Sequence, residues 1–257
     1  MTNDDGIEAD ALGPLTAALS ALGTVDVIVP EQNWSGAGHS ITLFRPLRCH
    51  ETRLRSGQLA YVTDGSPTDC VRLAMLGFLP EKPDLVVSGI NRGANLGDDI
   101  TYSGTVAAAM EGLLSSVPSI AISLASFSGD ADYEPAASFA ALLGTNVLQH
   151  GLAPDALLNV NVPAVPRDAI KGIAVTRLGK RNYRDKLVER LDPYGNSYYW
   201  VGGPAIVEAA EVGTDIAALR DGHISVTPIH LDLSSHLLIE KLANWDWGWS
   251  GPMELRT

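Results

Sequence analysis

Short apolar runs rich in β-branched residues alternate with Ala- and Leu-rich stretches between residues 1 and 165. Continuous apolar runs of this kind are typical of strands buried on both faces, as in a parallel sheet covered by helices. The expected strands are Thr24–Pro30, Asp84–Gly89, Ser119–Leu124 and Leu157–Val162, and the expected helices are Pro14–Leu22, Pro67–Leu76, Thr105–Leu114 and Glu134–Gln149. This alternation predicts an α/β fold with a doubly wound, mostly parallel sheet sandwiched by helices, which is Rossmann-like.

The pattern changes after Pro166, where alternating strand-like pieces are separated by polar and Gly-rich turns, which favours antiparallel hairpins. These pieces are Ile173–Thr176, Tyr198–Val201 and Ile224–Pro228. We therefore expect a single domain over residues 1–257, with an α/β core at 1–165, a hairpin extension and oligomerisation arm at 166–235, and a C-terminal helix and tail at 236–257.

The expected arm is locally basic on an acidic protein, through Arg177, Lys180, Arg181, Arg184, Lys186 and Arg190. Such a run is usually only a solvated face. Exposed Tyr198, Tyr199 and Trp200 would also suit subunit contacts, where aromatic and Arg residues concentrate.

The charge and cysteine content limit the kinds of partner and cellular location that we expect. The 257 residues carry a formal net charge of −12, which disfavours binding to a nucleic acid polymer or an anionic membrane. Cys49 and Cys70 are too few for a disulfide framework. No stretch has the apolar length of a membrane span, and the acidic start lacks the features of a signal peptide, so we expect a cytoplasmic protein.

Two adjacent carboxylates, Asp4 and Asp5, stand between Asn3 and Gly6. Neighbouring acids repel each other and can point at one spot only from a turn, and a hard cation would stabilise such a pair. Asn, Asp and Gly also dominate ordinary polar turns, so the tetrapeptide alone leaves both interpretations open.

Other polar loops follow the predicted strands, at the sheet edge where open α/β folds bind ligands. Together with the aspartates, Ser35 and Asn91 complete an all-oxygen donor set of the kind that Mg²⁺, Mn²⁺ or Ca²⁺ accepts. Ser103, Gly104 and Thr105 open a helix, whose N-terminus is suited to a phosphate, although Ser103 could equally be only an N-cap. Metal and phosphate sites together indicate phosphoryl transfer or hydrolysis.

Several further features favour structural roles. The segment Ser66–Asp69 has the pattern of a helix cap, and the lone His39 is a weak catalytic signal. His223 and His230 flank a strand and favour structural roles. The segment starting at Gly36 does not match the dinucleotide-binding fingerprint, because Ile41 stands where its third glycine should be. Neither a Gly-x-Ser-x-Gly nor a His-Glu-x-x-His motif occurs in the sequence.

Seven segments in order resemble the family of the stationary-phase survival protein SurE: Thr2–Ile7, Pro30 with Ser35–Gly36, Asp64–Cys70, Val87–Gly93, Ser103–Thr105, Leu158–Pro163 and Ile224–Pro228. The resemblance implies a metal-dependent 5'-nucleotidase acting on nucleoside monophosphates, often with 3'-nucleotidase or exopolyphosphatase activity. It places the metal ligands on Asp4, Asp5, Ser35 and Asn91, for one Mg²⁺ or Mn²⁺ per subunit. It also implies a homodimer or homotetramer joined partly through an exchanged hairpin.

For such a reaction we expect the cation to screen the phosphate charge while Asp4 or Asp5 orients or deprotonates the attacking water. Ser103, Gly104 and Thr105 would hold the remaining phosphate oxygens, with assistance from Asn95.

The chain departs from the family pattern at its start. Family members place a short apolar strand before the Thr-Asn-Asp-Asp segment, and here only Met1 precedes Thr2. Loss of a central strand would cost more than the roughly 5–15 kcal/mol by which a domain is stable. The expectation is therefore either that the assigned start is too late or that the chain is a catalytically weakened, nucleotide- or phosphate-binding oligomer. A glycosyl or acyl transferase ranks lower, since no donor site is apparent.

Overall fold

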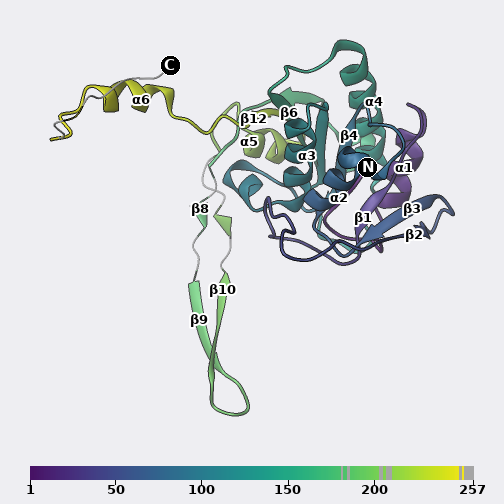
Figure 1. Ribbon diagram of the computed structural model, residues 1–257, viewed down its shortest axis with the longest axis horizontal. Coiled ribbons are helices and arrows are strands. Elements are labelled where there is room, and N and C mark those ends of the chain that lie inside the picture. Colours follow the sequence, from purple (N-terminus) through teal and green to yellow (C-terminus); the bar gives the residue numbers. More distant parts are fainter. Residues whose placement is uncertain (181, 184–185, 203–204, 207–209, 249–250, 252–257) are drawn as a thin grey trace.

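The computed structural model describes residues 1–180, 182–183, 186–202, 205–206, 210–248 and 251. Its main sheet has five strands in the order β4-β5-β6-β12-β7. Strands β4, β5 and β6 run parallel, β12 is antiparallel to β6, and β7 is parallel to β12. The bounds are Val86–Arg92 for β4, Ser119–Leu124 for β5, Ala156–Val162 for β6, Ile224–His230 for β12 and Ile173–Val175 for β7. The mostly parallel α/β sheet that the sequence predicts is confirmed (Figure 1).

A second, three-stranded sheet lies beside the main one in the order β1-β3-β2. Its strands are β1 (Ile28–Pro30), β2 (Cys49–Arg53) and β3 (Leu59–Thr63), with β1 and β3 parallel and β2 antiparallel to β3. The apolar pattern predicts β1, although as a longer strand, and misses β2 and β3. These two strands are short and partly exposed, so they lack the continuous apolar character of the core strands.

Met1 and Thr2 connect the two sheets. The Met1 carbonyl accepts from the Ile28 N–H at 3.0 Å, and Thr2 exchanges backbone hydrogen bonds with Val87 and Gly89 of β4 at 3.1 and 2.9 Å. The turn that carries the aspartates therefore follows a segment paired on both sides. Next to this segment lies a cavity of about 400 Å³, between Val25 and Leu85.

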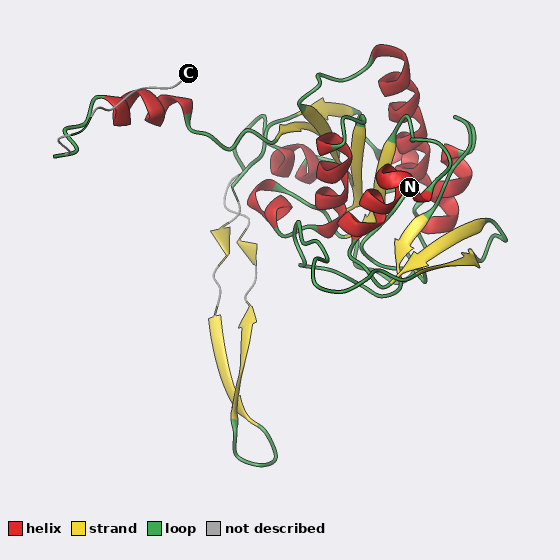
Figure 2. Cartoon of the chain, in the orientation of Figure 1, coloured by secondary structure: helices red, strands yellow, loops and turns green. Residues whose placement is uncertain are grey.

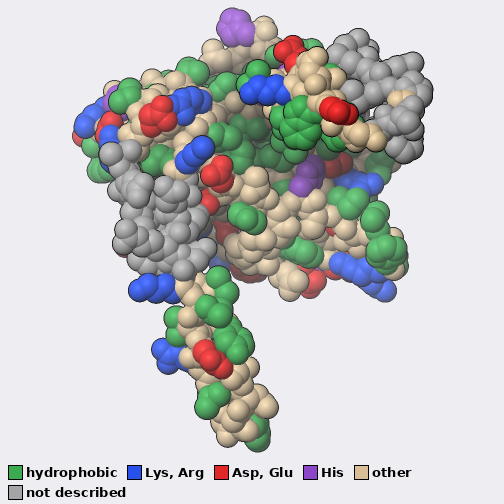
Figure 3. All heavy atoms as spheres, turned by 90° about the vertical axis from the view of Figure 1, so that its left-hand side faces the viewer, with side chains coloured by type: hydrophobic (Ala, Val, Ile, Leu, Met, Phe, Trp, Pro, Cys, Tyr) green, Lys and Arg blue, Asp and Glu red, His purple; other side chains and the backbone are tan. Residues whose placement is uncertain are grey.

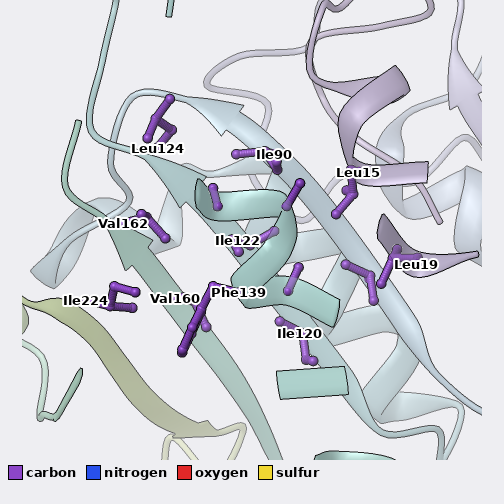
Figure 4. Close-up of a cluster of buried hydrophobic side chains, with 14 of the residues drawn as sticks. Leu15, Leu19, Ile90, Ile120, Ile122, Leu124, Phe139, Val160, Val162 and Ile224 are labelled. Carbon is purple, nitrogen blue, oxygen red and sulfur yellow. The ribbon is translucent and has the colours of Figure 1, made fainter. Parts of the chain in front are cut away.

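Helices cover both faces of the sheet, giving the three layers seen in Figure 2. Helices α1 (Leu12–Leu19) and α4 (Glu134–His150) pack on one face, while α2 (Pro67–Leu73) and α3 (Gly104–Leu114) pack on the other. Side chains of β5 alternate between the two: Ile120 and Ile122 join the cluster with α1 and α4 (Figure 4), whereas Ala121 packs against α3. Both faces of β5 are fully buried, as its apolar sequence predicts.

Side-chain caps fix the starts of α2 and α3. Ser66 and Asp69 form a reciprocal capping box at α2, as their spacing predicts, and Pro67 occupies the first turn. Beyond α2 the chain continues as a π-helical turn, η1 (Ala74–Phe78). Ser103 caps α3 through a hydrogen bond from the Val106 N–H at 3.1 Å. Short 3₁₀ turns, η2 (Gly97–Thr101) and η3 (Arg167–Ala169), precede α3 and follow β6.

The second half of the chain contains the predicted antiparallel hairpin, but two of the three predicted strand-like pieces belong to the main sheet instead. Strands β7 and β12, together with α5 (Asp215–Arg220), belong to the body, because β12 completes the main sheet and its first four residues are buried. A hairpin projects from the body, formed by β9 (Lys186–Leu191) and β10 (Ser197–Gly202), with β8 (Asn182–Tyr183) paired to β11 (Ala205–Ile206) nearer the body. Two of the basic residues expected in this arm, Arg181 and Arg184, lie outside the described residues.

Every residue of β9 and β10 is exposed, including Leu187, Tyr199 and Trp200. Figure 3 shows hydrophobic side chains along this projecting hairpin. The C-terminal helix α6 (His236–Ala243) also stands away from the body, and the tail from 252 to 257 lies outside the described residues. Over the part of the chain that the structure describes, no helix combines the length and apolar character needed to cross a membrane.

Candidate functional site

The Asn3–Gly6 tetrapeptide forms a closed turn at the carboxyl edge of the sheet. Asn3 clamps it by donating from Nδ2 to the Gly6 carbonyl at 2.9 Å and accepting from the Gly6 N–H at Oδ1. Gly6 has a φ of +86°, and a β-carbon there would lie 3.0 Å from the backbone of Gln32. The two interpretations of the motif are thus compatible, because this turn is what presents the adjacent carboxylates.

Asp4 is almost fully buried and is held by the start of α3. The Thr105 hydroxyl donates to its Oδ1 at 2.5 Å, and the Thr105 N–H donates to its Oδ2 at 3.1 Å. Gly104 is in such close contact that an added β-carbon would lie 2.8 Å from Asp4 Cβ. Burial raises the pKa of Asp4, and the hydrogen bonds from Thr105 act in the opposite direction.

Asp5 is more accessible and faces the other two loops. Its Oδ1 accepts from Asn33 Nδ2 and its Oδ2 accepts from the backbone N–H of Arg92, each at 3.2 Å. Burial, and then the negative charge of Asp4, raise the pKa of Asp5 to about 6. The two aspartates therefore form a coupled acidic pair between the first turn, the loop after β1 and the end of β4.

The two predicted neutral ligands lie in the loops that contact this pair. Ser35 follows β1, and its N–H donates to Asn33 Oδ1 at 2.8 Å, while the Trp34 N–H donates to the Asp4 carbonyl at 2.7 Å. Asn91, at the end of β4, donates from Nδ2 to the Gly93 carbonyl at 2.8 Å. Since that bond uses the amide nitrogen, Oδ1 of Asn91 is the atom that can act as a ligand.

This arrangement fits a hard divalent cation. Two adjacent carboxylates with raised pKa values are stabilised by a nearby positive charge, and the hydroxyl and amide oxygens add neutral donors. Among the described residues no group of three or more His, Cys, Asp or Glu side chains is placed to hold a metal ion, so a cation at this site would need the neutral oxygens of Ser35 and Asn91 beside the two carboxylates. Asp4, Asp5, Ser35 and Asn91 could therefore hold Mg²⁺ or Mn²⁺.

The predicted phosphate residues divide into two groups. Ser103 caps α3, and Gly104 and Thr105 lie directly against Asp4, so these residues lie beside the carboxylates. Asn95 belongs to a buried network beyond them: its Nδ2 donates to Ser123 Oγ at 2.9 Å, and its carbonyl accepts from two side chains, those of Asn159 and Asn161.

Three contacts at the site are not evident in the sequence. Asn33 and Arg92 both bind Asp5, although each stands in a polar loop that the strand pattern already marks as ligand-facing. His39, at the far end of the loop after β1, lies 3.1 Å from Glu111 of α3. That contact joins the loop that carries Ser35 to the helix that holds Asp4.

The fold and the acidic pair define an α/β protein with an oxygen-donor site at the point where the strand order reverses, between β1 and β4. The chain matches the family model of Survival protein SurE over residues 1–185, and it belongs to that family.

Relatives match over nearly the whole chain. A 5'-nucleotidase SurE of Chloroflexus aggregans is 50% identical, covering 96% of this chain and 98% of the relative, and one of Herpetosiphon aurantiacus is 48% identical, covering 96% and 97%. The crystal structure of the SurE protein from Aquifex aeolicus superposes with a TM-score of 0.82 at 42% identity, covering 94% of this chain and 96% of the other.

Proposed function

We propose that this chain is a metal-dependent 5'-nucleotidase that hydrolyses nucleoside 5'-monophosphates to a nucleoside and phosphate. The observation that carries the proposal is the adjacent pair of buried Asp4 and partly exposed Asp5, presented at the carboxyl edge of the sheet, with Asp4 held by α3. The names of the relatives from Chloroflexus aggregans and Herpetosiphon aurantiacus support the same activity. We extend the proposal to 3'-nucleotides and polyphosphate as secondary substrates.

The proposed cofactor is one Mg²⁺ or Mn²⁺ per subunit, held by Asp4, Asp5, Ser35 and Asn91. Such a cation screens phosphate charge and increases the acidity of water, which favours attack at phosphorus. The donor set of carboxylate, hydroxyl and amide oxygens suits these two ions.

The two aspartates take different roles in this proposal. Asp4 is 3% exposed and already accepts two hydrogen bonds from Thr105, so it acts as a fixed ligand. Asp5 is more open, and its carboxylate orients the attacking water and accepts its proton.

The phosphate is proposed to bind against the start of α3. Ser103 uses its Oγ as an acceptor for the cap, which leaves its hydroxyl proton to donate to a phosphate oxygen. The N-terminus of α3 adds the partial positive charge of its dipole. Asn95 has a second Nδ2 proton besides the one donated to Ser123, and it assists from the adjoining loop.

We also propose that the protein is a homodimer or homotetramer. Strands β9 and β10 expose seven large apolar side chains and are not part of the main sheet, so we propose that a partner subunit covers this surface. These residues are Leu187, Val188, Leu191, Tyr198, Tyr199, Trp200 and Val201.

A substrate panel tests the proposed activity. Purified protein is incubated with 5'-AMP, 5'-GMP, 5'-CMP, 5'-UMP, 3'-AMP, ribose 5-phosphate and polyphosphate, each with Mg²⁺, with Mn²⁺ and with excess chelator, and released phosphate is measured. We expect release from the 5'-nucleotides with either metal and a loss of at least 100-fold, roughly, with chelator. Nucleotide binding by equilibrium dialysis without any phosphate release would instead support the alternative, a binding oligomer without turnover.

A further inference from the structure

We infer that Phe127 forms the nucleobase platform of this site, with the base of the substrate stacked on the exposed face of its ring. The inference deepens the proposed function, because it names how the site distinguishes a nucleotide from a simple phosphate ester. Phe127 lies in the loop between β5 and α4, and 78% of its surface is exposed. Exposure of a single aromatic side chain is ordinary by itself, so the inference depends on where Phe127 lies relative to the acidic pair.

Contacts through Arg92 and Gly93 connect the loop that carries this ring to Asp5. The backbone N–H of Arg92 donates to Asp5 Oδ2, and the guanidinium of the same residue donates to the Phe127 carbonyl, from Nε at 3.0 Å and from Nη2. One residue therefore joins the acidic pair to the loop that carries the aromatic ring. Arg92 therefore contacts Asp5 through its backbone and the Phe127 backbone through its guanidinium.

Gly93 makes room for the ring. A β-carbon at Gly93 would lie 2.5 Å from Cε1 of Phe127, so the ring occupies the space that any side chain there would fill. The Gly93 N–H also donates to the Leu124 carbonyl at 2.9 Å, which fixes this segment to the end of β5. One side of Phe127 is thus supported by backbone, while the rest of the ring stays open to solvent.

The spatial order suits a nucleotide. With phosphate at the start of α3 and at Asp4–Asp5, the sugar lies over the end of β4 and the base reaches Phe127. Stacking on an aromatic ring accepts any base, because every base has a π-face. The structure thus favours a broad base range in which purines, having the larger surface, bind more tightly than pyrimidines.

A second candidate for the nucleobase platform is Tyr102, just before α3. Tyr102 is also exposed, and its carbonyl accepts from the Gly38 N–H at 2.9 Å, in the loop after β1. Tyr102 directly precedes Ser103, so a base on that side would lie beside the phosphate end rather than across the site from it. The geometry favours Phe127, and the comparison of the two residues is part of the test.

The test compares kcat/KM for 5'-AMP and for ribose 5-phosphate, which lacks the base, in the wild type and in Phe127→Ala, Phe127→Trp, Tyr102→Ala and Phe44→Ala. Phe44 is a fully exposed aromatic in the loop between β1 and β2 and serves as the matched control. We expect Phe127→Ala to lower kcat/KM for AMP about tenfold, mainly through KM, and to leave ribose 5-phosphate within about twofold. Phe127→Trp should keep or improve the AMP value.

Other results would overturn the inference. An equal loss for both substrates would mean that Phe127 acts only structurally, and no loss for AMP would mean that the base does not contact it. A base-selective loss in Tyr102→Ala alone would mean that Tyr102, and not Phe127, contacts the base. Absence of phosphate release by the wild type would count against the proposed function, not against the platform. In that case, equilibrium dialysis of AMP and ribose 5-phosphate with the same variants still tests whether Phe127 binds the base.

Discussion

Thr105 binds Asp4 with two groups, its hydroxyl at 2.5 Å from Oδ1 and its backbone N–H at 3.1 Å from Oδ2. The two residues are 101 positions apart in the chain. This contact is the direct link between the turn that carries the acids and the helix that is proposed to bind phosphate. Thr105 is fully buried. The geometry therefore favours a role for Thr105 in supporting Asp4 over a direct contact with substrate.

Replacing Thr105 by Val should weaken the metal site while the fold persists. Val keeps the shape but removes the hydroxyl donor, so Asp4 loses one of its two bonds from Thr105. Loss of such a supporting contact typically lowers metal affinity or activity about 10- to 100-fold. Calorimetric titration with Mn²⁺ and phosphate release measure the two effects, with Thr105→Ser as the control that retains the hydroxyl. Equal behaviour of the Val and Ser variants would exclude this role.

Replacing Gly104 by Ala should displace Asp4. The new β-carbon would lie 2.8 Å from Asp4 Cβ and 3.3 Å from Pro67 Cγ, and neither neighbour is the end of a flexible side chain. We expect a destabilisation of about 1–3 kcal/mol in urea unfolding together with loss of metal-dependent activity. Gly129→Ala is the matched control, because nothing lies within 4 Å of its added β-carbon. A fully active, fully stable Gly104→Ala variant would contradict the described packing.

Asp215 should connect Gly179, just before the hairpin, to Gly97, just after Asn95. This buried carboxylate accepts from the N–H groups of Gly97, Gly179 and Ile216, each at 2.8 Å. Asp215→Asn removes the charge that strengthens these bonds, and we expect about 2–3 kcal/mol of destabilisation, since bonds to charged groups contribute more than neutral ones.

Hydrogen exchange at the Gly97 and Gly179 amides measures this connection directly. Both amides should exchange faster in Asp215→Asn, whereas Asp221→Asn, at the exposed opposite end of the same helix, should leave them unchanged. Unchanged exchange in Asp215→Asn would show that other contacts hold the two segments together.

The exposed hairpin should control assembly. Leu187→Asp and Trp200→Asp place charges on an apolar surface that folding of the body does not use, so we expect smaller particles with an unchanged circular dichroism spectrum. Light scattering after gel filtration gives the mass, and Leu142→Asp, on the exposed face of α4, is the control. An unchanged mass in both hairpin variants would place the subunit contact elsewhere.

The core strands could be predicted because their chemistry is local. Strand β5 reads as six apolar or small residues in a row, and the structure buries all six. Strand β12 could not be placed in the same way, because its partner β6 lies more than 60 residues earlier and its alternating pattern equally suits a hairpin. Pairing over that distance depends on packing of the whole sheet.

The site shows the same division. The meeting of the loops that carry Asp5, Asn33 and Arg92 could be predicted from their positions after the strands. The role of Thr105 could not, since a hydroxyl at a helix start is equally suited to a phosphate, a cap or a carboxylate. Only the folded turn at Asn3–Gly6 decides which of these it meets.

The most direct test of the account is metal-dependent phosphate release from 5'-AMP by the wild type, Asp5→Asn and Asp10→Asn. Asp10 is an exposed acid in the same N-terminal segment, paired with Arg55, and its replacement controls for loss of charge. We predict that Asp5→Asn lowers kcat by about 1,000-fold or more with its thermal unfolding unchanged or raised, while Asp10→Asn stays within about twofold of the wild type. Equal turnover by Asp5→Asn and the wild type would contradict the claim that the Asp4–Asp5 pair is the catalytic centre.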